Sequence, residues 1–230
     1  MKTKALRAAF PHTIPVFTGY LVLGISYGVL MTASGFPFWT PMVTSLTIFA
    51  GSMEFVLVNL LLSGFDLLQA FLMTLLINAR HLFYGIAMLD KYRGMGWKKL
   101  YLIFGLTDET FSINCSIDPP EGVDRGWFCL FVTLLDHSYW FLGATLGGLL
   151  GSILHFNTEG LDFVMTAMFV VIFIEQWKKD TNHLSALIGV ALPVACLVLF
   201  GADSFMIPAM IAILAGLTLA RKPLEGGAAA

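Results

Sequence analysis

Long apolar runs, separated by short charged or turn-forming stretches, fill most of the 230-residue chain. A helix rises about 1.5 Å per residue and the hydrocarbon core of a bilayer is about 30 Å thick, so most of these runs are long enough to cross it. The pattern predicts an all-α polytopic membrane protein of seven or eight transmembrane segments. These segments lie at about residues 12–33, 42–62, 67–89, 100–117, 127–154, 161–177, 184–200 and 204–219.

The polar ends and loops define the expected domain organisation. Residues 1–11 are positively charged, and no short apolar region with a cleavage site follows them, so we expect a retained cytoplasmic tail. Residues 12–220 are expected to form a single integral membrane domain, and residues 221–230 a disordered tail. The acidic, proline-containing loop at 118–126 is the best candidate for a boundary between two halves.

Part of the first predicted helix recurs 119 positions later in the chain. The matched pairs are Tyr20 and Tyr139, Leu23 and Leu142, Gly24 and Gly143, Gly28 and Gly147, and Leu30 and Leu149. With two inserted residues, Glu54 then matches Glu175. We therefore expect two three-helix repeats at about 12–95 and 127–201, linked by 100–117, an organisation typical of secondary transporters. The repeats are parallel if 100–117 crosses completely, and inverted if it is re-entrant.

The distribution of basic residues is in conflict with three complete early crossings. After three crossings, the basic N-terminal tail and the basic loop at 90–99 would lie on opposite sides of the membrane, although positive charge prefers one side. This conflict indicates that one early segment does not cross completely.

Composition excludes several other classes of protein. The chain is 57% hydrophobic and only 12% charged, whereas a soluble domain carries about 25% charged residues. A net charge of −2 without a basic stripe gives no reason to expect nucleic-acid binding. The three cysteines are scattered and lack metal-ligand spacing, so we expect no zinc site, disulfide framework or cofactor.

Several ionisable or amide side chains interrupt the apolar runs. They are Glu54, Asn78, Arg80, His81, Asp108, Glu109 and Asp136. A charged residue at the centre of a bilayer costs about 2.5–3.5 kcal/mol on insertion scales, so each should face a partner or a wet cavity. We expect these side chains to meet at a polar site near the middle of the membrane, and segment 100–117 to be broken at Asp108–Glu109.

Some of these residues also have a structural interpretation. Glu54 has no cation within a helical turn and is expected to take up a proton, and Arg80 could form a buried structural ion pair. His81 could be a satisfied core histidine. Gly24 and Gly28 form a GxxxG pattern, which favours close helix packing over a substrate-lining role.

Five short segments in this order resemble the AzlC family, the large subunit of bacterial branched-chain amino acid exporters. They are GYLVLGISYG at 19–28, AGS at 50–52, NARH at 78–81, TDET at 107–110 and GLDF at 160–163. The resemblance covers nearly the whole chain. It implies export of hydrophobic amino acids such as valine, leucine and isoleucine, driven by the proton gradient across the bacterial cytoplasmic (inner) membrane. It also implies a small membrane partner, AzlD. Glutamine often stands in the family where this chain has Glu54, and a carboxylate there would change the coupling or the substrate.

An amino acid zwitterion requires a donor for its carboxylate and an acceptor for its ammonium group. Arg80 suits the carboxylate, and Glu54, Asp108 or Glu109 suit the ammonium. We expect substrate binding by Arg80, Asn78, Glu54, Gly51, Ser52 and Gly24. We expect proton coupling by His81, Asp108, Glu109 and Asp136.

Two other function classes compete with a transporter. An intramembrane enzyme would use Asp108, Glu109 and His81 as acid and base, but the sequence contains no GxSxG, HExxH or phosphate-loop motif. A non-catalytic assembly subunit would use the same residues only to hold helices together.

Overall fold

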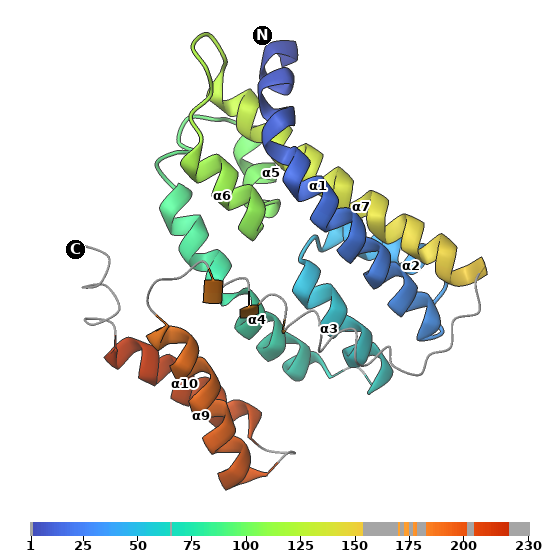
Figure 1. The fold of residues 1–230 in the computed structure, drawn as a ribbon, viewed down its shortest axis with the longest axis vertical. Coiled ribbons are helices and arrows are strands. Elements are labelled where there is room, and N and C mark those ends of the chain that lie inside the picture. Colours follow the sequence, from blue (N-terminus) through green and yellow to red (C-terminus); the bar gives the residue numbers. More distant parts are fainter. Residues whose placement is uncertain are drawn as a thin grey trace. The chain divides into compact units, whose positions relative to one another are not determined.

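The computed structural model describes residues 2–64, 66–153, 170, 173–174, 177–178, 183–201 and 205–220, and these residues form helices and connecting turns (Figure 1). The chain divides into two compact units, residues 1–161 and 162–230. Most of predicted segment 161–177, Glu175 and the tail at 221–230 lie outside the described residues.

The described part of the first unit contains α1 (Lys2–Ala33), α2 (Trp39–Thr47), α3 (Gly51–Leu62), α4 (Leu67–Met88), α5 (Lys98–Phe104), α6 (Asp108–Ser116) and α7 (Arg125–Ile153). Among the described residues, α1, α4 and α7 are the helices that are long and apolar enough to cross a bilayer. The other four have 7 to 12 residues, so the longest of them spans only about 18 Å.

Helices α1 and α7 lie side by side and run in the same direction (Figure 1). Their backbones touch at glycines. A Cβ added at Gly28 would lie 2.3 Å from the carbonyl oxygen of Ala144, and one at Gly147 would lie 2.2 Å from that of Ile25. Gly24 and Gly143 face each other in the same way one turn away. Small residues permit this approach, and the close contact then stabilises the helix pair by van der Waals packing.

The matched glycines of the sequence repeat are therefore the residues that meet in this contact. Gly24 matches Gly143 and Gly28 matches Gly147, and each pair lies at the same level of two parallel helices. The wider repeat of three helices stays a prediction.

Helices α2 and α3 form a hairpin, which we call hairpin 1. Phe38, just before α2, lies against Gly148 near the C-terminal end of α7. Phe49, in the turn between α2 and α3, stacks on His137 nearer the middle of α7, with ring centroids 4.3 Å apart. Helix α3 then returns towards the end at which α2 began (Figure 1).

Helices α5 and α6 form hairpin 2, which enters from the opposite end. Lys98 Nζ, at the start of α5, lies 3.5 Å from Oδ1 of Asp124, just before α7. Gly105, in the turn, lies against Thr133, and α6 returns so that Ile113 packs in the core at the end where α5 began. Segment 100–117 is broken as predicted, but the break lies at residues 105–107, and Asp108 and Glu109 begin the second helix.

Segment 42–62, predicted as one crossing, is instead two short helices. The N–H of Ala50 donates to Glu54 Oε1 (3.1 Å), which satisfies a backbone group at the start of α3. Phe49 has a φ of 48°, a left-handed conformation that reverses the chain. The apolar pattern did not reveal this turn, because the residues on both sides of it are equally hydrophobic.

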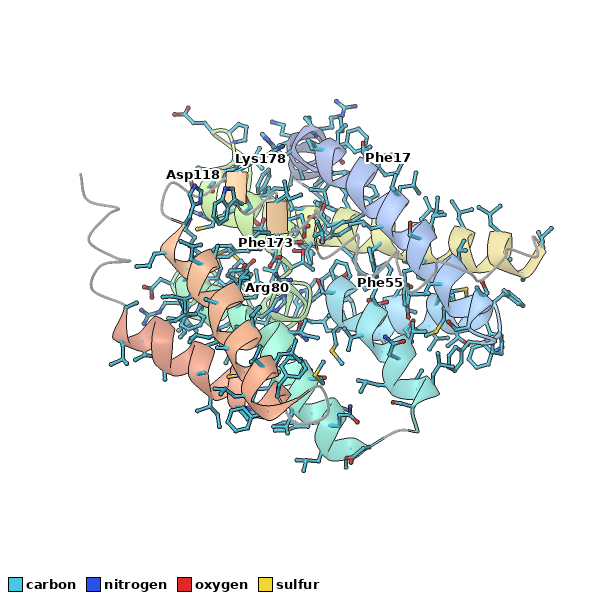
Figure 2. The ribbon with its side chains drawn as sticks, turned by 60° about the horizontal axis from the view of Figure 1, so that its bottom comes forward. Phe17, Phe55, Arg80, Asp118, Phe173 and Lys178 are labelled. Carbon is cyan, nitrogen blue, oxygen red and sulfur yellow. The ribbon has the colours of Figure 1, made fainter. Side chains whose placement is uncertain are left out.

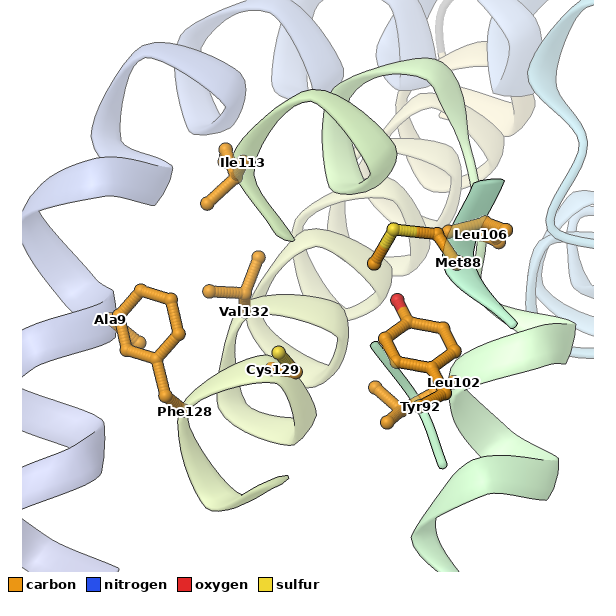
Figure 3. Packing of buried hydrophobic residues seen from close by; sticks show 9 residues of the cluster. All are labelled: Ala9, Met88, Tyr92, Leu102, Leu106, Ile113, Phe128, Cys129 and Val132. Carbon is orange, nitrogen blue, oxygen red and sulfur yellow. The ribbon is translucent and has the colours of Figure 1, made fainter. Parts of the chain in front are cut away.

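The first helix begins at Lys2 rather than near His12, so Pro11 and Pro15 lie inside it rather than at its start. Tertiary packing explains the difference, since Ala5 and Ala9 are fully buried. Ala9 belongs to a core cluster that joins α1, α5, α6, α7 and the end of α4 (Figure 3). Its members are Ala9, Met88, Tyr92, Leu102, Leu106, Ile113, Phe128, Cys129 and Val132.

The described part of the second unit contains α9 (Leu184–Phe200) and α10 (Met206–Leu219). These bounds agree with the predicted segments to within two residues. The two helices pack against each other where Gly216 lies close to Ile188 and Leu192.

The contact between α1 and α7 predicts that Gly28→Ala destabilises the protein. We expect a loss of about 1–3 kcal/mol in the free energy of unfolding, because the new methyl group would overlap the α7 backbone. Gly19→Ala, on the same helix with nothing within 4 Å, is the matched control and should be neutral or stabilising by up to about 1 kcal/mol. Unfolding by dodecyl sulfate in mixed micelles measures both, and equal stability of the two variants would contradict the observed contact.

Candidate functional site

The turns of the two hairpins meet beside the middle of α1 and α7. The ring of Phe49 in hairpin 1 lies 6.5 Å from that of Phe104 and 6.4 Å from that of Tyr20. A bulky residue at positive φ costs about 1–3 kcal/mol and persists only where the surrounding structure holds it. Such strain is typical of functional sites. The region where the two turns meet, which we call the hairpin junction, is therefore a candidate functional site.

His137 on α7 holds both hairpins at this junction. Its Nε2 lies 3.1 Å from the carbonyl oxygen of Ser45 in hairpin 1, so Nε2 carries the hydrogen. Its Nδ1 lies 2.7 Å from the hydroxyl of Tyr101 in hairpin 2, which donates to it if the imidazole is neutral.

Glu54 is a fully buried carboxylate at the start of α3. Its Oε1 accepts hydrogen bonds from the Ala50 N–H (3.1 Å) and from the indole N–H of Trp140 (2.9 Å). Its Oε2 is buried without a hydrogen-bond partner. The position near the N-terminus of a helix favours a negative group there.

Arg80 and Asp108 form an ion pair between α4 and the first turn of α6. Arg80 Nη2 lies 3.1 Å from Asp108 Oδ2, and about a third of each side chain is exposed. Two of their atoms, Arg80 Nε and Asp108 Oδ1, are buried without partners. One turn further along both helices, Tyr84 stacks on Phe111 with ring centroids 4.4 Å apart. The structure thus places Arg80 beside the acidic segment at the start of α6.

A second polar group connects α1, α6 and α7. The hydroxyl of Tyr20 lies 2.5 Å from Glu109 Oε2 and 2.8 Å from the hydroxyl of Thr107. The Thr107 hydroxyl donates to that of Thr110 (3.1 Å), which donates to Asp136 Oδ2 (3.0 Å). Asp136 is fully buried, and its Oδ1 has no hydrogen-bond partner.

The remaining predicted residues lie close to these groups or in helix contacts. Asn78 and His81 are on α4, where His81 Nδ1 lies 3.2 Å from the Asn78 carbonyl oxygen. Gly51 at the start of α3 faces the ring of Trp140, and Ser52 follows it, half-buried. Gly24 lies in the contact between α1 and α7, which favours its packing role.

The predicted site residues therefore fall into three groups rather than one. Arg80 contacts Asp108, Glu109 joins Asp136 through hydroxyl groups, and Glu54 bonds to Trp140. Figure 2 shows Phe55, the neighbour of Glu54, well apart from Arg80. The expectation that Glu54 joins the Arg80–Asp108 pair is not met by this structure.

An apolar groove of about 340 Å³ lies between α4 and α5. It includes His81, the residue after Arg80, and Leu106, in the turn of hairpin 2. Ligand pockets for small molecules have volumes of about 300–1,000 Å³, so the groove is large enough for an amino acid side chain.

Sequence reasoning did not select five polar or aromatic residues at the junction. They are Tyr20, Thr107, Thr110, His137 and Trp140. Tyr20, Thr107 and Thr110 do lie within the segments GYLVLGISYG and TDET that carry the family resemblance, so that signal was available. His137 and Trp140 follow Asp136 on α7. His137 interrupts an apolar run as His81 does, whereas nothing in such a run distinguishes Trp140 from a core residue.

The bond between Trp140 and Glu54 predicts a specific loss of stability. Trp140→Phe should lower the free energy of unfolding by about 1–3 kcal/mol, because it removes the side-chain donor to a buried carboxylate. The same change in a Glu54→Met background should cost less, since the carboxylate that accepts the indole hydrogen bond is then already absent. Trp127→Phe, on the same helix, is the control. Equal costs of Trp140→Phe in both backgrounds, from denaturation in micelles, would show that the hydrogen bond contributes nothing.

Comparison with known proteins places the chain in a family. The model of the AzlC protein family matches residues 15–154, which include α2 to α7 and most of α1. No solved structure matches the chain.

The relatives are membrane proteins. The branched-chain amino acid transport protein AzlC of Bacillus subtilis is 62% identical over 221 residues, which are 96% of this chain and 87% of that protein. A membrane protein of Haemophilus influenzae is 44% identical over 97% of this chain and 92% of its own length. The inner membrane protein YgaZ of Escherichia coli is 26% identical over 89% of this chain and 83% of its own length. The chain is therefore a membrane protein that belongs to the AzlC family, a family of transport proteins and not of enzymes.

Proposed function

We propose that this protein exports branched-chain and other hydrophobic amino acids across the bacterial cytoplasmic membrane. The export is coupled to protons and takes place together with a small AzlD-like membrane subunit. The observation that carries the proposal is the 62% identity, over nearly the whole chain, to a protein named for branched-chain amino acid transport. The polar groups at the hairpin junction supply the chemistry that such a substrate requires.

The Arg80–Asp108 pair is suited to an amino acid zwitterion. Each partner keeps one buried atom without a hydrogen bond, Arg80 Nε and Asp108 Oδ1. The carboxylate of the substrate would bind the Arg80 guanidinium, and its ammonium group would bind the Asp108 carboxylate. Arg80 and Asp108 would then separate around the ligand, and each would still have a partner of opposite charge. Asn78 and His81 lie on the same helix within one turn and complete this region.

The apolar groove beside His81 would receive the hydrocarbon side chain of the substrate. Apolar pockets distinguish substrates that differ by one methylene by only about 1–3 kcal/mol, so we expect several hydrophobic amino acids to be transported.

The carboxyl groups on α6 and α7 would carry the coupling proton. Asp136 and Glu109 form a connected pair, and His81 and Asp108 lie on the adjoining helices α4 and α6. Glu54, with Gly51 and Ser52, would hold hairpin 1 against Trp140 in the conformation described here. These three residues would not contact the substrate in that conformation.

The basic residues indicate an orientation in the membrane. Both Lys2 and Lys98 lie over the ring of Trp127, so the N-terminal segment and the loop before α5 are at the same end of the first unit. We call it the basic end. The loops at the other end, residues 34–38 and 63–66, contain no lysine or arginine. The positive-inside rule then places the basic end in the cytoplasm. Because hairpin 1 does not cross, the charge conflict in the sequence disappears.

One observation favours the alternative of an assembly subunit with purely structural charges. The Arg80–Asp108 pair and the Tyr84–Phe111 stack together join α4 to α6, as a structural ion pair would. Transport by Arg80→Gln and Arg80→Lys variants separates the two functions.

Arg80→Gln should reduce transport of labelled valine in liposomes about 10- to 150-fold, because a lost charge-assisted hydrogen bond costs about 1.5–3 kcal/mol. Arg80→Lys should retain part of the activity, since it keeps the charge but not the planar fork. Arg93→Gln, an exposed loop arginine, is the control. Arg80→Gln protein that is folded and transports at the wild-type rate would remove Arg80 from the substrate site and favour the structural alternative.

The orientation predicts which positions react with a membrane-impermeant maleimide in intact cells. In a variant without Cys115, Cys129 and Cys196, a cysteine replacing Ser63 should be labelled. Cysteines replacing Lys4 or Arg93 should react only after permeabilisation. Labelling of Lys4→Cys and Arg93→Cys from opposite sides would mean that hairpin 1 crosses the membrane, and would overturn the proposed orientation.

A further inference from the structure

A continuous line of hydrogen-bonding side chains joins two carboxyl groups in the first unit. It runs from Glu109 through Tyr20, Thr107 and Thr110 to Asp136. The successive oxygen–oxygen distances are 2.5, 2.8, 3.1 and 3.0 Å. Glu109 at one end is partly exposed, whereas Asp136 at the other end is fully buried. The line therefore leads from an accessible carboxyl group to an enclosed one.

The number of hydrogen atoms determines how many contacts in this line can be hydrogen bonds at the same time. It contains four contacts, but its three hydroxyl groups supply only three hydrogens. With both carboxylates ionised, one contact would lack a hydrogen. One extra proton on either carboxyl group supplies the fourth, and all the bonds in the line then point in the same direction. A single excess proton therefore fits this arrangement of oxygen atoms.

We propose that this line carries the coupling proton between Glu109 and Asp136, with Tyr20, Thr107 and Thr110 as its intermediate carriers. The proposal rests on the proton coupling of the proposed function and adds the path that the proton takes. It assigns a role in transport to three hydroxyl groups.

The transfer balances in protons. Protonated Glu109 donates to the Tyr20 oxygen, Tyr20 passes its own hydrogen to Thr107, and Thr107 passes its hydrogen to Thr110. Thr110 then passes its hydrogen to Asp136. Glu109 ends as a carboxylate and Asp136 as a carboxylic acid, while each hydroxyl still holds one hydrogen. The free Oδ1 of Asp136 is available to accept a further hydrogen bond in the next step.

The neighbouring titratable groups have other partners. Asp108 is paired with Arg80, and His81 lies 3.2 Å from the Asn78 carbonyl oxygen. Both ring nitrogens of His137 are occupied, by Tyr101 and by the Ser45 carbonyl oxygen. Within the part of the chain that the structure describes, hydroxyl groups connect Glu109 to Asp136 and to none of these other titratable groups.

Tyr20→Phe removes one carrier and keeps the ring, which packs edge-on against Trp140 and Phe49. Substrate-driven proton movement in liposomes, read with a pH-sensitive dye, should fall about a hundredfold. Exchange of labelled for unlabelled valine, which requires no net proton movement, should be retained. Tyr27→Phe is the matched control, because it removes a buried tyrosine hydroxyl on the same helix that bonds only outside the line, to Thr44. It should retain both activities.

Thr110→Val and Thr110→Ser test the line at a second position. Valine has nearly the same shape but no hydroxyl, so it should separate exchange from proton movement as Tyr20→Phe does. Serine restores the hydroxyl and should restore proton movement. If Thr110 acted only through packing, valine would preserve function better than serine, because valine keeps the methyl group that serine lacks. The expected order is the opposite.

Wild-type proton movement in folded Tyr20→Phe or Thr110→Val protein would overturn the proposal, and so would wild-type transport without any proton movement. If the wild type moves no amino acid, the proposed function fails, and infrared spectroscopy then tests the line separately. At neutral pH the wild type should show a carbonyl-stretch band of a protonated carboxyl group that persists in Glu54→Gln, disappears in a variant combining Glu109→Gln with Asp136→Asn, and shifts in Tyr20→Phe. Absence of that band in the wild type would overturn the hydrogen count.

Discussion

The close contact between α1 and α7 determines the arrangement of everything else in the first unit. Glycines at matched positions let the two backbones touch, so the helices run in parallel at a fixed register. This register brings Tyr20 on α1 to the level of Asp136 and Trp140 on α7. A larger residue at the contact would separate the helices and, with them, the polar side chains that they carry.

The two hairpins pack their turns against the α1–α7 helix pair. Polar backbone groups at a helix break cannot face lipid, so they must be buried against protein. Both breaks lie against the middle of α1 and α7, where a side chain satisfies the first backbone groups of each returning helix. Glu54 does so for α3 and Thr107 for α6. The same geometry brings carboxylates, hydroxyls and an imidazole to the region where the two hairpin turns meet. Broken helices of this kind form the binding sites of many transporters.

A transporter of zwitterions must keep opposite charges apart from lipid yet available to a ligand. In this protein the Arg80–Asp108 pair is only partly exposed and incompletely hydrogen-bonded, whereas Asp136 is fully enclosed and reached through hydroxyl groups. In the function proposed above, this division gives substrate and proton separate places within a few residues of one helix, α6. Coupling between them would then pass through the hairpin that carries Asp108, Glu109 and Thr110.

The sequence by itself determined the helical class, the long spans and the family, because hydrophobic run length, glycine spacing and short motifs are local properties of the chain. It also determined which side chains are too costly to leave in lipid, and that segment 100–117 is broken next to Asp108–Glu109. The tertiary structure alone decided that segment 42–62 folds back at Phe49, that α1 begins at Lys2, and which buried groups bond to one another. Those outcomes depend on contacts between residues more than 80 positions apart, such as Glu54 with Trp140 and Tyr20 with Glu109. No local pattern encodes which of several equally apolar faces will meet, so only the packed helices could select them.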